Sequence, residues 1–183
     1  MRRVLAVLVR NQPGVMTRVS ALFSRRGFNI QSVAVGATDD PALARMTLVL
    51  DEDEPGVEQV TKQLHKLVDV IKVSDITDDE PIERELVLVR LAADASRRLE
   101  AAQMAQLVGA RLVDVGEESV TVELTGPTAD VEAALRILRA FGFKELVRSG
   151  TVAMARPGRV ARTAGPAGGV PPSKLASEGV RVI

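Results

Sequence analysis

The order of apolar segments in the first 76 residues is the feature that most constrains the fold of this chain. Val4 to Val9 is an unbroken apolar run, which is typical of a strand buried on both faces. From Val15 the apolar side chains follow helical spacing up to Arg25, Arg26 and Gly27, which together are typical of a helix C-terminus. The predicted order is strand, helix, strand, strand, helix, strand, over residues 4–9, 15–26, 29–38, 42–50, 57–68 and 70–76.

This order predicts the split βαβ, ferredoxin-like sandwich, in which four antiparallel strands carry two helices on one face. The chain itself would leave the other sheet face uncovered, so a partner is expected over that face or its edge. After a polar linker at residues 78–84 the same order returns. Its segments are strands at 85–91, 110–115, 119–126 and 142–155 and helices at 97–108 and 128–141, with Thr128 as a plausible N-cap. The predicted fold class is therefore α+β, with two βαββαβ domains in tandem.

Composition excludes several classes of protein. The formal net charge is zero, and four Phe without Trp or Tyr supply no platform for base stacking, so nucleic-acid binding is not expected. No apolar segment reaches 18 residues and the start has no signal-peptide layout, so we expect a cytoplasmic protein without membrane contact. The absence of Cys excludes disulfides and thiol chemistry. Residues 157–183 contain four Pro and five Gly and are predicted to form a flexible tail.

No segment carries a pattern typical of catalysis. The single histidine, His65, falls on the polar side of the second predicted helix beside Glu58 and Lys62, which favours a solvated side chain over a general base. Acidic residues at 39–40 and 51–54 lack the spacing of a calcium loop and are better explained by solvated loops and helix N-terminal charge. We therefore expect no catalytic residue, no metal site and no cofactor in this chain.

The corner between the first strand and the first helix could bind an anion. The stretch "NQPG" (residues 11–14) begins the helix on a glycine, so the first free N–H groups point out of a turn that no side chain fills. Asn11 adds an amide, which both donates and accepts hydrogen bonds. Asn, Pro and Gly are also ordinary turn residues, and on these residues alone a simple turn is the favoured interpretation.

A second corner follows the same helix, where Asn29 comes soon after Gly27. A helix of 12 residues spans about 18 Å, so one chain cannot easily use both corners for one small ligand. A two-fold dimer could set Asn29 of one chain against Gly14 of the other. Such a pocket would offer N–H donors for a carboxylate, carbonyls for an ammonium group, and Val15 or Ile30 for an apolar side chain. These features describe a small amino acid.

Five segments carry a resemblance to a known family. They are "NQPGVMTRVSALFSRRGFNIQSVAVGATDDP", "RMTLVL", "KQLHKLVDVIKV", "ERELVLVRL" and "FGFKELVRSGTVAMAR". The N-terminal part resembles the ACT domain, a small-ligand sensing module of ferredoxin-like fold. The whole of residues 1 to about 156 resembles the regulatory (small) subunit of acetolactate synthase, also called acetohydroxyacid synthase. The match is loose over residues 92–118, which leaves the helix there uncertain, and the tail from Pro157 is longer than expected.

The resemblance implies a non-catalytic partner of a large catalytic subunit. In that family the small subunit raises the activity of the large one and confers feedback inhibition by branched-chain amino acids, chiefly valine, in valine, leucine and isoleucine biosynthesis. The effector lies between the ACT domains of a homodimer. The large subunit holds thiamine diphosphate, FAD and magnesium. The matching effector-binding positions here are Asn11, Gly14, Val15 and Met16 of one chain with Asn29 and Ile30 of the other.

The repeated element order, the composition of the tail and the resemblance together give the predicted domain boundaries. They are an ACT effector-binding domain at residues 1–78, a C-terminal ferredoxin-like domain at 79–156 and a flexible tail at 157–183. A free-standing ACT-type sensor or interaction module, which binds an amino acid without an enzyme partner, is the alternative. A third hypothesis, an enzyme in its own right, would require acetolactate formation by the isolated chain, which the missing catalytic groups make unexpected.

Overall fold

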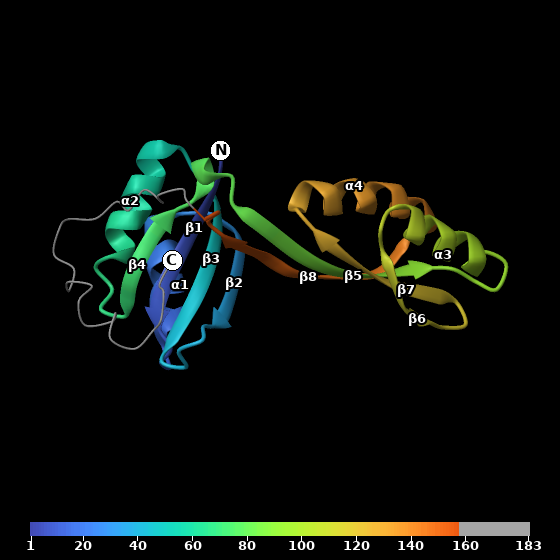
Figure 1. Cartoon of the computed structure of the whole chain (residues 1–183), viewed down its shortest axis with the longest axis horizontal. Helices are drawn as coiled ribbons and strands as arrows, with labels where there is room; N and C mark the ends of the chain where they lie inside the picture. The colour runs from blue at the N-terminus through green and yellow to red at the C-terminus, as the bar shows by residue number, and fades with distance from the viewer. Residues whose placement is uncertain (158–183) are drawn as a thin grey trace.

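The computed structural model describes residues 1–157, which form two lobes, each built on a four-stranded antiparallel sheet. The strand order is β2-β3-β1-β4 in the first sheet and β6-β7-β5-β8 in the second. Figure 1 shows an elongated molecule in which the long strands β5 and β8 extend from the second lobe to the first. The predicted α+β class with two βαββαβ units is confirmed. The predicted flexible tail, beyond residue 157, lies outside the described residues.

In the first lobe, helices α1 and α2 cover one face of the sheet. Alternate residues of the central strand β1 point to that face, so that Leu5, Val7 and Val9 are fully buried against the helices. The rings of Phe23 and Phe28 pack edge to face, with 6.0 Å between the ring centroids. The elements are β1 (Arg2–Arg10), α1 (Val15–Arg26), β2 (Ile30–Ala37), β3 (Leu43–Asp51), α2 (Glu54–Leu64) and β4 (Val70–Asp75), followed by the short 3-10 helix η1 (Thr77–Asp79).

The second lobe repeats this layout, with α3 and α4 on one face of its sheet (Figure 1). Val87, Val89 and Leu91 of its central strand are fully buried under those helices. The helix predicted at residues 97–108, where the match to the family is loose, is present as α3. The elements are β5 (Ile82–Ala92), α3 (Arg98–Leu107), β6 (Arg111–Val115), β7 (Ser119–Gly126), α4 (Thr128–Leu138), the 3-10 helix η2 (Arg139–Phe141) and β8 (Phe143–Met154). Within residues 1–157, no helix has the length and apolar character that a membrane crossing requires.

The helix-free face of the first sheet, here called the outer face, is partly covered by the end of β8. The Thr151 amide donates to Ser32 Oγ over 3.0 Å, and the Ala153 amide donates to Thr47 Oγ1 over 3.3 Å. The expectation that the chain leaves this face uncovered is therefore wrong. It failed because a strand of the second sheet returns to the first lobe and closes a small apolar cluster there. The buried members of that cluster are Val4, Ala6, Ile76 and Ala153.

Strand β8 approaches the first lobe closely at Gly150. Its φ is +77°, a left-handed conformation, and it lies where the register between β5 and β8 shifts. A Cβ atom at this position would lie 2.8 Å from Ser32 Oγ and 3.2 Å from the carbonyl oxygen of Val33. Both the backbone conformation and the space therefore require glycine. An ion pair between Arg2 and Glu83 also joins the two lobes, with 3.0 Å between Nη1 and Oε1.

Three local predictions are wrong, at one linker and two helix ends. The linker predicted at residues 78–84 instead contains part of η1 and the first residues of β5, which starts at Ile82. Thr128 is the first helical residue of α4 rather than its N-cap, which is Pro127, and its hydroxyl lies 3.3 Å from Thr151 Oγ1. The apolar stripe of the second helix was extended to Val68, but α2 ends at Leu64 and the Val68 side chain is exposed. In the two helices the type of element was predicted correctly: the start of α4 was misplaced by one residue, and the apolar spacing continues past the last helical residue of α2.

Candidate functional site

Asn11 ties the corner after β1 to the turn between β2 and β3. Its backbone N–H donates to the Ala42 carbonyl over 2.7 Å, and its side-chain amide donates to the Pro41 carbonyl over 3.0 Å. The turn at 38–43 is itself closed by Asp40, whose carboxylate accepts from the Ala42 amide over 2.8 Å. Asn11 therefore holds two loops together at the N-terminal end of α1.

Gly14 is the N-cap of α1 and has a φ of +85°. No side chain caps this helix, and its first turn contains no acidic residue. The N–H groups of the first helical turn therefore have no side-chain acceptor from the cap position. A Cβ atom at Gly14 would lie 3.0 Å from Arg18 Nη1, so glycine also keeps a close contact with that guanidinium possible.

Arg18 is a feature of this corner that sequence reasoning missed. Its Nε donates to the carboxylate of Asp69 over 2.6 Å, and the Asp69 side chain is buried while that of Arg18 is about half exposed. The Asp69 backbone carbonyl also accepts from the Arg10 amide over 2.9 Å. The spacing of four residues after Gly14 was an available signal, since it places Arg18 one turn above the helix start. The corner thus combines free helical N–H groups with a positioned cation.

Val15 and Met16 occupy different environments in the first turn of α1. The Val15 side chain is buried in the core of the first lobe, whereas Met16 is 41% exposed. Only the backbone of Val15 is therefore available to a ligand. Its amide makes a long hydrogen bond of 3.4 Å to the Gln12 carbonyl. Met16 is the residue of this pair whose side chain can contact a ligand.

Asn29 and Ile30 lie at the other end of α1. The helix ends at Arg26, and its C-cap Gly27 has a φ of +71° and donates its N–H to carbonyls of the last turn. Asn29 is exposed and Ile30 is half-buried at the start of β2. One chain therefore places Asn11, Gly14, Val15 and Met16 together and leaves Asn29 and Ile30 at the far end of the helix.

The strand β2 lies at an edge of the first sheet. It pairs with β3 on one side, and no strand within residues 1–157 pairs with its other side. An unpaired edge presents a row of N–H and C=O groups that can pair with another chain. This edge begins at Ile30, beside the Asn29 corner.

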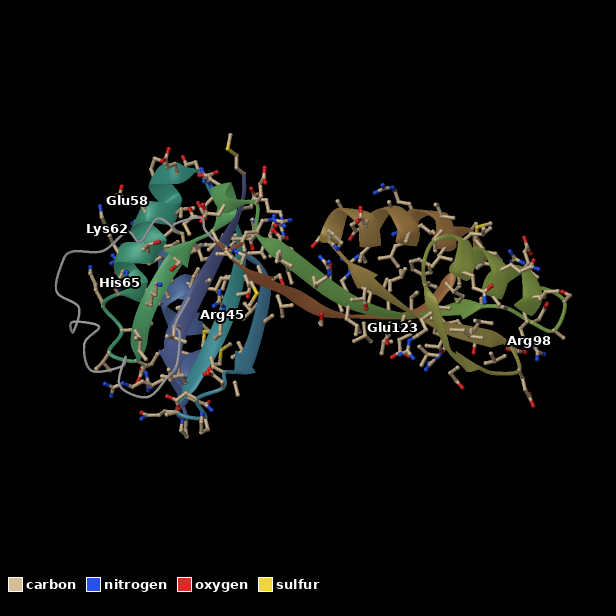
Figure 2. The ribbon with its side chains drawn as sticks, viewed as in Figure 1. Arg45, Glu58, Lys62, His65, Arg98 and Glu123 are labelled. Carbon is tan, nitrogen blue, oxygen red and sulfur yellow. The ribbon has the colours of Figure 1, made fainter. Side chains whose placement is uncertain are left out.

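The groups considered for catalysis are placed as the sequence predicts. His65 is exposed at the end of α2, and Glu58 and Lys62 form an ion pair of 2.6 Å on the same helix. Figure 2 shows these three residues along the side of α2 that faces away from the second lobe. Asp53 is the N-cap of α2 and accepts from the Gly56 amide over 2.9 Å, and Glu54 lies in the first turn, which confirms the predicted helix N-terminal charge for part of the 51–54 acidic cluster.

Among the described residues, no three acidic, His or Cys side chains gather closely enough to hold a metal ion. The site that the geometry favours is therefore a binding corner built from backbone N–H groups and one arginine.

Comparisons with known proteins cover both lobes. A family profile described as "AHAS small subunit-like ACT domain" matches residues 5–72, and one described as "Small subunit of acetolactate synthase" matches residues 84–157. The acetolactate synthase small subunit of Mycobacterium leprae (strain TN) is 51% identical over 152 residues, which is 83% of this chain and 90% of the relative. The probable acetolactate synthase small subunit of Archaeoglobus fulgidus is 48% identical over 156 residues, which is 85% of this chain and 98% of the relative.

A solved structure has the same two-lobed architecture. The crystal structure of the acetolactate synthase small subunit from Thermotoga maritima superposes with a TM-score of 0.79 at 37% identity, and the match covers 85% of this chain and 98% of that one. Two family profiles, curated relatives near 50% identity and this structure agree over nearly all the described residues. The chain belongs to the family of acetolactate synthase small subunits.

Proposed function

We propose that this chain is the regulatory subunit that activates a large catalytic subunit of acetolactate synthase and makes it sensitive to feedback by valine. The family and its ACT domain support the regulatory role. In this proposal the chain contributes no catalytic group, and thiamine diphosphate, FAD and magnesium are held by the large subunit. The observation that carries the effector site is the uncapped N-terminus of α1 at Gly14, with Arg18 beside it.

The amino acid's carboxylate is proposed to bind at the Gly14 corner. Free N–H groups at a helix N-terminus and the positive end of the helix dipole both favour an anion. The guanidinium of Arg18, fixed by Asp69, adds a full positive charge within reach of the same corner. A charge-assisted hydrogen bond contributes about twice as much as a neutral one. The corner therefore has the donors that a carboxylate requires.

The rest of the ligand requires a second copy of the chain. An ammonium group needs carbonyl acceptors, and an aliphatic side chain needs apolar contact; Asn29 and Ile30 of the partner copy would supply both. The unpaired edge of β2 begins at Ile30 and offers a route to a two-fold contact. Because the two corners lie at opposite ends of α1, a symmetric dimer would hold two equivalent sites.

Regulation follows if the effector favours one arrangement of the dimer. A ligand shared by two chains stabilises the arrangement in which both of its corners are in contact with it. A coupling free energy of about 1–3 kcal/mol between this site and the catalytic subunit would change the affinity at one site by about 5- to 150-fold when the other is occupied.

Titration calorimetry of the full chain with valine, leucine and isoleucine tests the site directly. The decisive variant is Gly14→Asp, because a carboxylate there would occupy the anion position beside Arg18. We expect it to lose valine binding and valine inhibition while it still folds and still activates the large subunit. Gly109→Asp is the control, because it places the same charge and a similar positive-φ strain in the second lobe, where an added Cβ meets nothing within 4 Å, and it should keep valine inhibition. Unchanged valine inhibition in Gly14→Asp would refute the site.

The alternative, a free-standing sensor, makes a different prediction for partners. The proposed subunit should co-purify with a thiamine-dependent catalytic chain and raise its acetolactate formation. A sensor without an enzyme partner would bind the amino acid and leave that activity unchanged. The isolated chain should form no acetolactate from pyruvate under either hypothesis.

A further inference from the structure

The crease between the two lobes contains a cavity of about 360 Å³ whose only charged lining side chains, within residues 1–157, are two arginines. Arg45 enters it from β3 on the outer face of the first sheet, and Arg84 enters it from β5 of the second. Figure 2 marks Arg45 in the first lobe, on the strand β3 that neighbours β2. Among residues 1–157, no acidic side chain lines the cavity. Its walls are apolar and include Val35, Ile82, Val152 and Met154.

Arg45 is an incompletely compensated cation. It is half-buried, its Nε is buried without a hydrogen-bond partner, and no ion pair joins it to any residue in the described range. Burial lowers the pKa of its guanidinium from the ordinary value. Removing a charged group from water is costly unless an opposite charge or hydrogen bonds replace the water. An anion in the cavity would supply the opposite charge.

The backbone around Arg45 leaves the site open. Its direct neighbour on β2 is Gly36, where a Cβ atom would meet nothing within 4 Å. The apolar wall side chains are strongly exposed for their type, with Val152 and Met154 each more than half exposed. Arg84 is exposed and its Nη1 donates to the carbonyl of its neighbour Glu83 over 2.7 Å, which leaves its other N–H groups for a ligand.

From this arrangement we propose that the crease is a second binding site, which takes a small aliphatic carboxylate. The two guanidinium groups suit the planar head of a carboxylate, and the apolar walls suit a short branched hydrocarbon. The absence of an acidic side chain leaves no counter-charge for an ammonium group. The crease site should therefore prefer a simple carboxylate to an amino acid, which distinguishes it from the proposed effector corner at Gly14.

The test uses 3-methylbutanoate, which is valine without its ammonium group, and two-dimensional amide NMR of the full chain. Saturable shifts of the Gly36, Thr47 and Ala153 amides are expected at constant ionic strength, with sodium chloride as the reference titration. The dissociation constant for valine, measured from the same amide shifts, should be at least about tenfold higher than that for 3-methylbutanoate, because the ammonium group of valine has no partner in the cavity. Shifts that follow ionic strength alone would overturn the proposal.

Variants make the assignment specific. Arg45→Gln should weaken 3-methylbutanoate binding by about tenfold or more, because it removes a charge-assisted contact. Arg90→Gln removes an arginine of the same strand as Arg84 that is paired with Glu145 outside the cavity, and it should bind as the parent does. If Arg45→Gln does not fold, Arg84→Gln takes its place in the binding titration, because Arg84 is exposed and its replacement should leave the fold intact. Unchanged binding in the folded cavity variants would refute the site. Binding that persists in Gly14→Asp would separate this site from the effector corner.

Discussion

The contact of β8 with the first lobe can be tested by replacing Gly150 with alanine. Two penalties are expected. The φ of +77° places a non-glycine residue in the left-handed region, at about 1–2 kcal/mol. The added Cβ would lie 3.2 Å from the Val33 carbonyl oxygen and 2.8 Å from Ser32 Oγ, so β8 or β2 must move.

That movement has its own cost. Displacing Ser32 from the Thr151 amide removes a hydrogen bond of 3.0 Å, with a net contribution of about 0.5–1.5 kcal/mol. Crowding the apolar contact beneath it adds about 1 kcal/mol, the low end for overpacking a core, because the outer face can open toward solvent. The expected loss for Gly150→Ala is therefore about 2.5–4.5 kcal/mol of unfolding free energy.

Gly109→Ala is the matched control. Gly109 has a φ of +76°, almost the same as Gly150, but an added Cβ would meet nothing within 4 Å. It should lose only the backbone term of about 1–2 kcal/mol. Urea unfolding of the two variants and the parent, followed by circular dichroism, gives the two losses. The difference between them isolates the contact between the lobes. Equal losses would show that β8 does not press on β2 in solution, and would refute this account of the interface.

Three further measurements test other parts of the structure. Arg18→Ala leaves the buried Asp69 carboxylate without its cation and should cost about 1–2 kcal/mol in urea unfolding, whereas Arg18→Lys should recover part of it; equal stability of all three chains would contradict the pairing. Asp53→Ala removes the cap on the Gly56 amide and should cost about 1 kcal/mol, seen as a lower thermal midpoint; Asp53→Asn should keep most of it. Hydrogen bonds to the Asp94 side chain from residues 96 and 97 lower the pKa of that carboxyl, so its contribution to stability is present at neutral pH and is lost as the pH falls through the folded pKa; an NMR titration that gives an ordinary pKa would contradict these bonds.

The fold was accessible from sequence because its signals are local. The apolar run of β1, the helical stripe of α1 and the glycine at its end each lie within a few turns of chain, and all three are where the pattern predicts. The covering of the outer face could not be predicted in the same way. The covering brings Val4 and Ala153 together, and the small side chains involved do not recur with helical or strand spacing in the sequence.

In the candidate site, too, the residues with local sequence signals were predictable and those fixed by distant contacts were not. Gly14 was predictable because a turn followed by a helical stripe marks an N-terminus, whatever the rest of the chain does. The role of Arg18 was not, because its position is fixed by Asp69, which lies in a different loop 51 residues away. Whether Asn29 and Ile30 complete the site stays a prediction, since it depends on a second copy of the chain.

The return of β8 to the first lobe has a consequence for biosynthesis on the ribosome. All strands of the first sheet have been made by residue 75, but Ala153, which completes the apolar cluster with Val4 and Ala6, follows much later. At about 5–20 residues per second, the nascent N-terminal lobe waits roughly 4–15 s with those side chains uncovered. Truncated chains that stop between the lobes should therefore be bound by holdase chaperones more strongly than the finished protein.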